Sequence, residues 1–229
     1  VKSMNDSQSS KSHSGMIMLT KITLVNVLLS LPILSNSFTL RNNQVKKVSF
    51  LKMSAHKTEI IPVKCHDDED PVLRAGVAEL FKLYFDELFE LGCDLGFQGF
   101  QNEWIDLPGK YDFGKMGGLF VAVSVPEGAE SQKDSKDVVG CVAIRPLDDN
   151  CGEVKRMYIR KSHRRNGVGN LLSQCIIDHA WELGYNEIKL DSLERLAGAV
   201  KLYENLGFSR IDPYCECPEE DHVCMNLFK

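Results

Sequence analysis

From Thr58 onward, short apolar runs alternate with longer amphipathic stretches, and this alternation limits the choice of fold more than any other feature of the sequence. Runs such as "GLFVAVSV" and "VVGCVAIRPL" are short and rich in β-branched residues, which is typical of strands. The longer stretches have the amphipathic pattern of helices that cover a sheet. The alternation therefore predicts an α/β domain over residues 58–229.

Turn residues and helix-end signals give the bounds of these elements. Strands are predicted over residues 58–65, 118–125, 138–147, 152–160, 186–192, 209–214 and 222–229. Helices are predicted over residues 72–91, 166–183 and 194–207, with Gly184 and Gly207 at the ends of the last two. This order predicts one three-layer domain around a mixed sheet.

Residues 1–57 have the composition of a targeting leader. The apolar run of residues 22–34 is short for a membrane span and suits a signal peptide that ends near residue 37. Ser35 and Ser37 would stand at positions −3 and −1 before the cleavage site. The residues that follow, up to 57, are basic, rich in hydroxyl groups and free of acids, like a transit peptide. This pairing resembles the bipartite presequences of algae with secondary plastids. We expect plastid delivery and no membrane association of the mature form; the alternative is the secretory pathway.

The remaining chain is acidic. Residues 1–58 hold 8 of the 27 basic residues and one of the 32 acidic residues, which leaves a net charge of −12 on residues 59–229. Binding to nucleic acid depends largely on neutralising phosphates with basic side chains. The charge therefore argues against a nucleic-acid partner.

The chain has eight cysteines, and their spacing does not predict a disulfide framework or a metal site. Cys215, Cys217, His222 and Cys224 are of types that ligate zinc, but we expect Cys215 and Cys217 to point to opposite faces of their segment. The sequence contains no CxxC pair. We expect free thiols, and no metal.

The stretch "RKSHRRNGVGNLL" joins the strand that ends near residue 160 to the next helix. Amides at a helix N-terminus lack internal partners, glycine allows close approach of a ligand, and the helix dipole favours an anion. The sequence lacks the GxxxxGK[ST] and GxGxxG patterns, which argues against a P-loop or dinucleotide site. What it has is Arg164-x-x-Gly167-x-Gly169, and a pyrophosphate would fit there.

In this context the chain resembles the GCN5-related N-acetyltransferase (GNAT) superfamily. The resemblance covers residues 58–229 and rests on "GCVAIRPLDDNCGEVKRMYIRKSHRRNGVGNLL", "NEIKLDS" and "AVKLYENLGF". The segment "FQNEWIDLPGKY" is also similar to a subgroup of small, mostly uncharacterised members. The resemblance implies a mostly antiparallel sheet with a splay between its fourth and fifth strands, acetyl-CoA as co-substrate, and a monomer or homodimer.

The resemblance also implies the residues that hold acetyl-CoA. The amides of residues 165–169 would cradle the diphosphate, and pantetheine would pair with the open strand edge at residues 157–159. The expected cofactor-binding residues are Met157, Tyr158, Ile159, Arg164, Arg165, Asn166, Gly167, Val168, Gly169 and Asn170. One departure is Leu196, which stands where many members have an asparagine that contacts CoA.

Acetyl transfer to an amine needs a base, an oxyanion donor and an acid for the leaving thiolate. Glu153 is the expected base, because it lies eleven residues before Arg164, as the catalytic glutamate does in GCN5-type enzymes. The amide of Met157 is the expected oxyanion donor, and Tyr203 in "LYENLGF" the expected acid. Lys155 and Arg156 are expected to point to opposite faces of their strand.

The expected function is therefore acetyl-CoA-dependent N-acetyltransfer to a small-molecule amine or a lysine side chain. Two alternatives stay open: a non-catalytic acyl-CoA-binding module, and a partner-binding domain that uses the basic strip "KR…RKSHRR". The acceptor side is acidic, which raises the hypothesis of a cationic amine. Its acids are Asp86, Glu87, Glu90, Asp94, Glu103 and Asp106.

Overall fold

The computed structural model describes residues 51–53, 56–63, 71–93, 103–126 and 137–229. The predicted signal peptide and most of the predicted transit-like segment lie outside these residues, so the leader stays a prediction. Asp94 also lies outside them. Within the described ranges, no helix is both long enough and apolar enough to cross a membrane.

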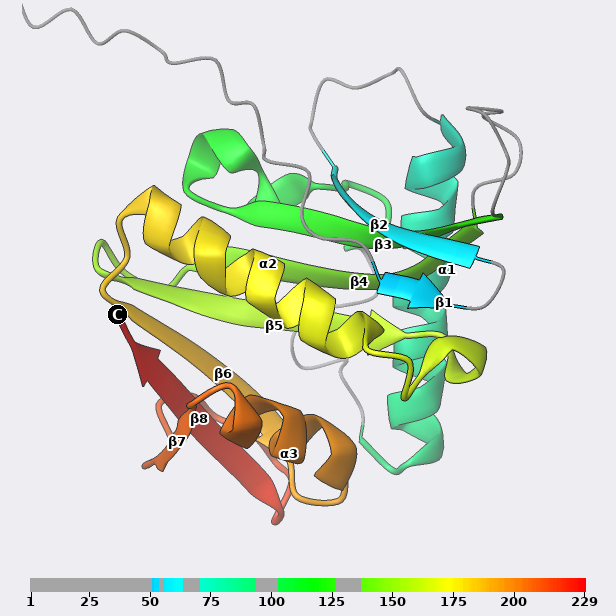
Figure 1. Cartoon of the computed structure of the whole chain (residues 1–229). Helices are drawn as coiled ribbons and strands as arrows, with labels where there is room; N and C mark the ends of the chain where they lie inside the picture. The colour runs from blue at the N-terminus through cyan, green and yellow to red at the C-terminus, as the bar shows by residue number, and fades with distance from the viewer. Residues whose placement is uncertain (1–50, 54–55, 64–70, 94–102, 127–136) are drawn as a thin grey trace, which may run out of the picture. The chain divides into compact units, whose positions relative to one another are not determined.

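The strands and helices follow the predicted order (Figure 1). The strands are β1 Leu51–Met53, β2 His56–Pro62, β3 Gly118–Pro126, β4 Asp137–Pro146, β5 Cys151–Ile159, β6 Glu187–Leu193, β7 Ser209–Ile211 and β8 His222–Phe228. The helices are α1 Pro71–Glu90, α2 Val168–Leu183 and α3 Ala197–Asn205, with single 3₁₀ turns η3 Gly109–Tyr111, η4 Phe113–Lys115 and η6 Lys161–His163. The expected domain start at Thr58 lies inside β2, and β1 was not predicted.

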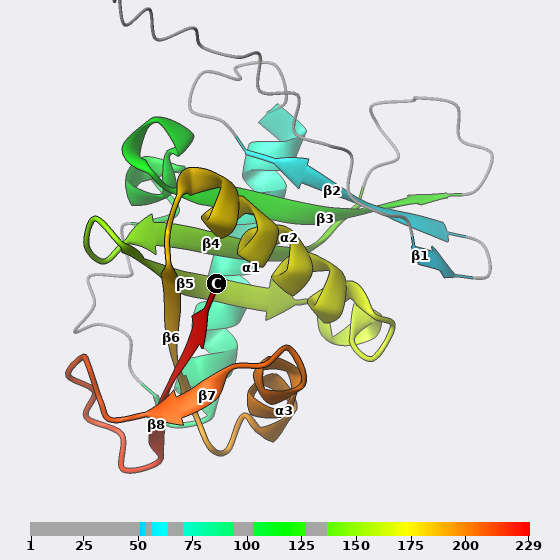
Figure 2. The ribbon, with the colours of Figure 1, turned by 60° about the vertical axis from the view of Figure 1, so that its left-hand side comes forward.

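The strands form one sheet in the order β1-β2-β3-β4-β5-β6-β8-β7. Only the β5–β6 pair is parallel among these neighbours. Helix α1 lies on one face of the sheet and α2 on the other (Figures 1 and 2). The predicted mixed, mostly antiparallel, three-layer fold is confirmed.

The helices bury their apolar sides in two cores, one shared by α2 and α3 and the other formed with α1. Leu80 and Phe81 of α1 pack with strand residues on one face, and Leu172 and Ile176 of α2 pack with those on the other. Burying one such side chain is worth about 1.5–3 kcal/mol relative to exposing it. The sheet therefore has a packed core on each of its faces, and the two cores together fix the positions of the central strands.

Helix α2 ends where the sequence predicts. Gly184 has φ 95°, and its amide donates to the carbonyl groups of Ala180 and Trp181. Glycine reaches this left-handed conformation without the cost that a Cβ adds. The helix begins at Val168, two residues after the predicted start, because the loop before it stays non-helical through Gly167.

Candidate active site

The site lies where β5 and β6 separate. Their parallel pairing runs from Cys151 opposite Glu187 to Val154 opposite Leu190 and stops there. Beyond this point β5 stays paired with β4, and β6 stays paired with β8. The two strands therefore diverge toward the C-terminal end of β5, which confirms the splay expected between the fourth and fifth predicted strands.

A β-bulge interrupts β5 within this open part. The β4–β5 register passes from Ala143 opposite Lys155 to Cys141 opposite Tyr158, so two residues of β5 face one of β4. Arg156, the first of the two, has φ 58°. Arg156 and Met157 stand outside the described registers with both β4 and β6. The backbone of Met157 therefore lies at an open strand edge, as an oxyanion donor must.

The bulge also corrects one prediction. Lys155 and Arg156 do not point to opposite faces of the strand, because the extra residue breaks the alternation. Both side chains are buried and both line the same pocket. The pocket is bounded by β5, β6, α1, α3 and the C-terminal segment. Its lining residues are Tyr84, Leu88, Cys93, Val154, Lys155, Arg156, Met157, Asp191, Ser192, Leu193, Leu196, Ala199, Tyr203 and Cys217.

Glu153 lies on β5, in the part still paired with β6, and is 1% exposed. Its carboxylate accepts a hydrogen bond of 2.6 Å from Arg145 Nε and one of 3.1 Å from the Tyr214 hydroxyl. Lys155 Nζ lies 3.4 Å from it. Burial, followed by the charge of Glu153, raises the pKa of Tyr214, so this phenol keeps its proton and stays a donor. Glu153 is thus an ordered carboxylate beside the splay.

Lys155 joins Glu153 to β6. Its Nζ donates to Asp191 Oδ1 at 2.7 Å. Burial opposes the charge on Lys155, but Asp191 and Glu153 together raise the pKa of this amine. Lys155 therefore stays protonated and cannot act as a base. Asp191 and Tyr214 were not predicted as site residues, because their side-chain hydrogen bonds to Lys155 and Glu153 are long-range and leave no local signal.

Tyr203 of α3 lies in the same pocket as Met157. Burial, with smaller contributions from Tyr84 and Asp191, raises the pKa of Tyr203, so its hydroxyl is a proton donor at neutral pH. Leu196 also lines the pocket, where the family pattern would have an asparagine. An apolar side chain at this place can pack against a ligand but cannot donate a hydrogen bond to it.

The predicted anion loop has the backbone of an amide cradle. Arg165 has φ 63° and Gly167 has φ 81°, and both turn the chain into α2. The Leu171 amide donates to the Gly167 carbonyl at 3.0 Å, so the helix amides before Leu171 have no intrahelical acceptor. A Cβ on Gly169 would lie 3.2 Å from the side chains of Ile159 and Leu202. Glycine there lets α2 approach β5 and α3 closely.

The side chains around this loop differ in what they can offer a ligand. Tyr158 and Val168 are buried, so they could contribute only through their backbones. Arg165 and Asn170 are exposed at the start of α2. Arg164 is turned the other way: it makes two hydrogen bonds of 2.7 Å to the Glu87 carboxylate on α1. A contact of the Arg164 side chain with acetyl-CoA stays a prediction.

Most of the basic strip is engaged within the protein. Arg160 pairs with Glu79, and Lys161 lies 3.9 Å from Glu87. No ion pair within the described part of the chain involves Arg165. Lys161 and Arg165 stay exposed, but the rest of the strip is buried or paired, which weakens the case for a partner-binding domain.

Two of the acids expected on the acceptor side are also paired with basic residues of the protein. Glu103 accepts two hydrogen bonds of 2.8 Å from the Arg156 guanidinium and one of 3.0 Å from the Tyr111 hydroxyl, and it also pairs with Lys110. Glu103 and Glu87 thus hold arginines of the site in place. Asp86 and Glu90 are exposed on α1.

The ion pair between Glu103 and Arg156 predicts that the free energy of unfolding falls at acid pH. Burial opposes its charge, but the hydrogen bonds and charge of Arg156 hold the pKa of Glu103 below its ordinary value of 4.5. Such a group stabilises the fold above its unfolded pKa, and this stability is lost as the pH falls through its folded pKa. We expect Glu103→Gln to lower the free energy of unfolding by about 2 kcal/mol at neutral pH. Its acid dependence should also be shallower than that of the wild type.

Urea denaturation at a series of pH values measures both effects. Glu90→Gln is the matched control, because Glu90 is exposed and its substitution should change stability by less than about 0.5 kcal/mol. A Glu103→Gln variant that kept the acid dependence of the wild type would contradict the prediction.

Comparisons with known proteins agree with this geometry. A family model described as acetyltransferase (GNAT) family matches residues 85–208. An uncharacterised N-acetyltransferase of Schizosaccharomyces pombe is 35% identical over 149 residues, which cover 64% of this chain and 85% of that protein. A GNAT-family acetyltransferase structure from Staphylococcus aureus matches with a TM-score of 0.57 at 19% identity, over 74% of this chain and 97% of that one. An acetyltransferase structure from Salmonella typhimurium with its cofactor acetyl-CoA matches with a TM-score of 0.52 at 16% identity, over 75% and 93%.

Proposed function

Because this chain belongs to the acetyltransferase (GNAT) family, we propose that it moves an acetyl group from acetyl-CoA to a primary amine by direct attack within a ternary complex. The observation that carries the proposal is the splay: an open, bulged edge of β5 faces a pocket and leads to the helix amides at Gly167. A thioester with a diphosphate tail needs both of these features at once.

The residues present fit acetyl-CoA. The amides of residues 165–169 and the exposed side chains of Arg165 and Asn170 would hold the diphosphate. The edge of β5 at residues 157–159 would pair with the pantetheine amides. Acetyl-CoA supplies an acetyl group that is already activated as a thioester. The transfer chemistry itself calls for no metal.

The chain's own groups then handle charge and protons. We propose that Glu153 takes the proton from the attacking amine, directly or through a water molecule. The Met157 amide would donate to the oxyanion that forms on the carbonyl, which is worth about 3 kcal/mol in comparable sites. Tyr203 would give its proton to the sulfur as the carbon–sulfur bond breaks.

Tyr203→Phe tests the last role. Loss of the Tyr203 hydroxyl should lower kcat by about 10-fold. This is less than the roughly 10²- to 10⁴-fold that is typical of general acid catalysis, because a thiolate leaves without full protonation. The dissociation constant of acetyl-CoA should stay unchanged, since the ring still packs against Phe208. Release of free thiol measures kcat, and calorimetry measures binding. A variant with full kcat would leave Tyr203 as a packing residue.

The acceptor is proposed only as a small-molecule amine or a lysine side chain. The hypothesis of a cationic acceptor loses part of its basis, since Glu87 and Glu103 pair with Arg164 and Arg156. Asp86 and Glu90 remain as exposed acids on α1. Turnover of neutral or anionic amines alone, in a panel of acceptors, would rule the cationic class out.

The experiment that tests the function has two stages on the full chain. Calorimetry first measures acetyl-CoA binding, and an amine panel then measures thiol release. Binding with turnover supports the proposal. Binding without turnover of any amine would favour the non-catalytic acyl-CoA-binding module, and no binding by the folded protein would overturn both.

A further inference from the structure

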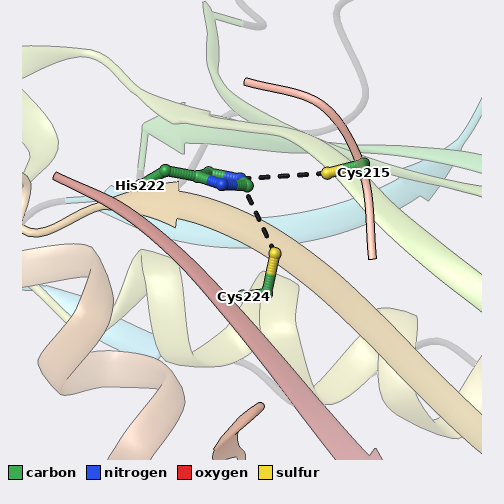
Figure 3. Close-up of side chains that lie close together, drawn as sticks. All are labelled: Cys215, His222 and Cys224. Carbon is green, nitrogen blue, oxygen red and sulfur yellow. Dashed lines mark hydrogen bonds between the residues drawn. The ribbon is translucent and has the colours of Figure 1, made fainter. Parts of the chain in front are cut away.

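Three side chains near the C-terminus converge on one point, outside the residues that the transfer reaction uses. Cys215 Sγ, His222 Nε2 and Cys224 Sγ all lie within 4.8 Å of one another. Figure 3 shows both sulfur atoms directed at the same imidazole ring. We propose that these residues form a zinc site with three protein ligands, which fixes the segment between β7 and β8.

The separations fit a tetrahedral ion. With Zn–S about 2.3 Å and Zn–N about 2.0–2.1 Å, a sulfur and a nitrogen of one tetrahedral site lie about 3.6 Å apart. Here His222 Nε2 lies 3.6 Å from Cys224 Sγ and 3.8 Å from Cys215 Sγ. Both sulfur-to-nitrogen separations are therefore close to those of a tetrahedral zinc site, and the two sulfur atoms lie within 4.8 Å of each other.

The local structure explains why the three atoms meet. His222 and Cys224 are two residues apart on β8, so their side chains share one face of the strand. Cys215 comes from the segment that returns from β7 and faces them. Cys224 is 2% exposed and the His222 side chain 9%, while Cys215 is half-buried, so the cluster is preformed and open to solvent on the Cys215 side.

Charge also favours an ion here. Zinc binding would release one proton from each thiol, and the two thiolates would balance the divalent charge. Asp191 Oδ2 lies 4.0 Å from His222 Nε2, while the other oxygen of Asp191 stays with Lys155. Two thiolates and an imidazole are the ligand types that select zinc over magnesium or calcium. A water molecule would complete the fourth position.

The position of the site gives it a role. The far end of the β7–β8 segment is already held, because Arg195 pairs with Glu219 and Asp221. The near end contains Tyr214, which donates to Glu153 and is followed directly by Cys215. A zinc ion at Cys215 would fix this end in the same way and keep Tyr214 against the carboxylate.

Metal analysis of the full chain tests the site. The reduced protein is equilibrated with zinc, freed of unbound ion and assayed by mass spectrometry; we expect about one zinc per chain, from one site. Titration with cobalt(II) should give the near-ultraviolet absorption of thiolate-to-metal charge transfer. Cys215→Ser, at a half-exposed position that should tolerate it, and Cys224→Ser should each lose this absorption and bind zinc at least 10-fold more weakly.

Cys217→Ser is the matched control, since Cys217 lies in the same segment but outside the cluster. It should bind zinc like the wild type. The proposal is overturned if the reduced wild type binds no zinc, if Cys217→Ser abolishes binding, or if Cys215 and Cys224 join in a disulfide that persists with zinc present. Acetyl-CoA binding measured with and without zinc keeps this result separate from the proposed function.

Discussion

Glu153→Gln is expected to lower kcat by about 10²- to 10³-fold, because an amide cannot take the proton from the attacking amine. The substitution keeps the shape of the side chain and its hydrogen bond from Tyr214. Acetyl-CoA should bind with an unchanged dissociation constant, because the residue lies in the paired part of β5, away from the helix amides. Thiol-release kinetics and calorimetry measure the two quantities on the same protein.

Glu153 also forms an ion pair with Arg145, so Glu153→Gln could lower kcat by displacing neighbouring side chains instead of by removing the base. Tyr214→Phe is the control: it removes one hydrogen bond to the carboxylate but leaves the base, and kcat should fall only a few-fold, by about 1 kcal/mol. Equal losses of kcat in the two variants would make Glu153 a positioning residue.

Gly167→Glu is expected to weaken acetyl-CoA binding by at least about 100-fold, through two effects that act in the same direction. A side chain at φ 81° costs about 1–3 kcal/mol of backbone strain and would distort the turn into α2. The added carboxylate would also stand where the diphosphate is proposed to lie, and like charges within a few ångströms repel strongly in a site of low dielectric.

Gly184→Glu provides the matched control. Gly184 lies at the other end of the same helix, has φ 95°, and a Cβ there would meet no atom within 4 Å. The strain and the charge are thus comparable, but the loop is intact, so acetyl-CoA affinity should match the wild type. Calorimetry measures the acetyl-CoA affinity of both variants, and circular dichroism confirms that both are folded. Equal loss of affinity in the two would assign the effect to the stability of α2 rather than to the loop.

The order of elements could be predicted from the sequence because each strand and helix has its own apolar pattern and its own end signals. Gly184 is an example, since a glycine after an amphipathic stretch commonly ends a helix. Nothing comparable marks the bulge at Arg156. No glycine or proline stands in "VKRMY". The extra residue is specified by pairing with β4 and by the hydrogen bond from Arg156 to Glu103, which lies 53 residues away.

The pairing of the basic strip could not be predicted for a related reason. In the sequence its charges are adjacent and look like one surface, but in the fold several of them pair with acids of distant segments. Arg160 and Arg164 find partners 81 and 77 residues away. Long-range ion pairs of this kind leave no local pattern from which they could be predicted.

The cysteine cluster, in contrast, carried a signal that was not used. The expectation that Cys215 and Cys217 point to opposite faces was wrong, because residues two apart in an extended segment share a face. His222 and Cys224 have the same spacing on β8, and both of their side chains lie on one face of that strand. Cys215 could then join them only through the path of the connecting segment, which no local rule specifies.

The bond between Arg156 and Glu103 has a consequence for the strand edge beside it. The left-handed backbone of Arg156 is unfavourable on its own, and it persists because Glu103 holds the guanidinium from a distant segment. Arg156 lies within the sheet, whereas Glu103 lies outside it, so the shape of this strand edge depends on a contact from beyond the sheet. We therefore expect a chain in which Glu103 is not docked to keep its β4–β5 pairing and to lose the bulge that exposes the Met157 backbone.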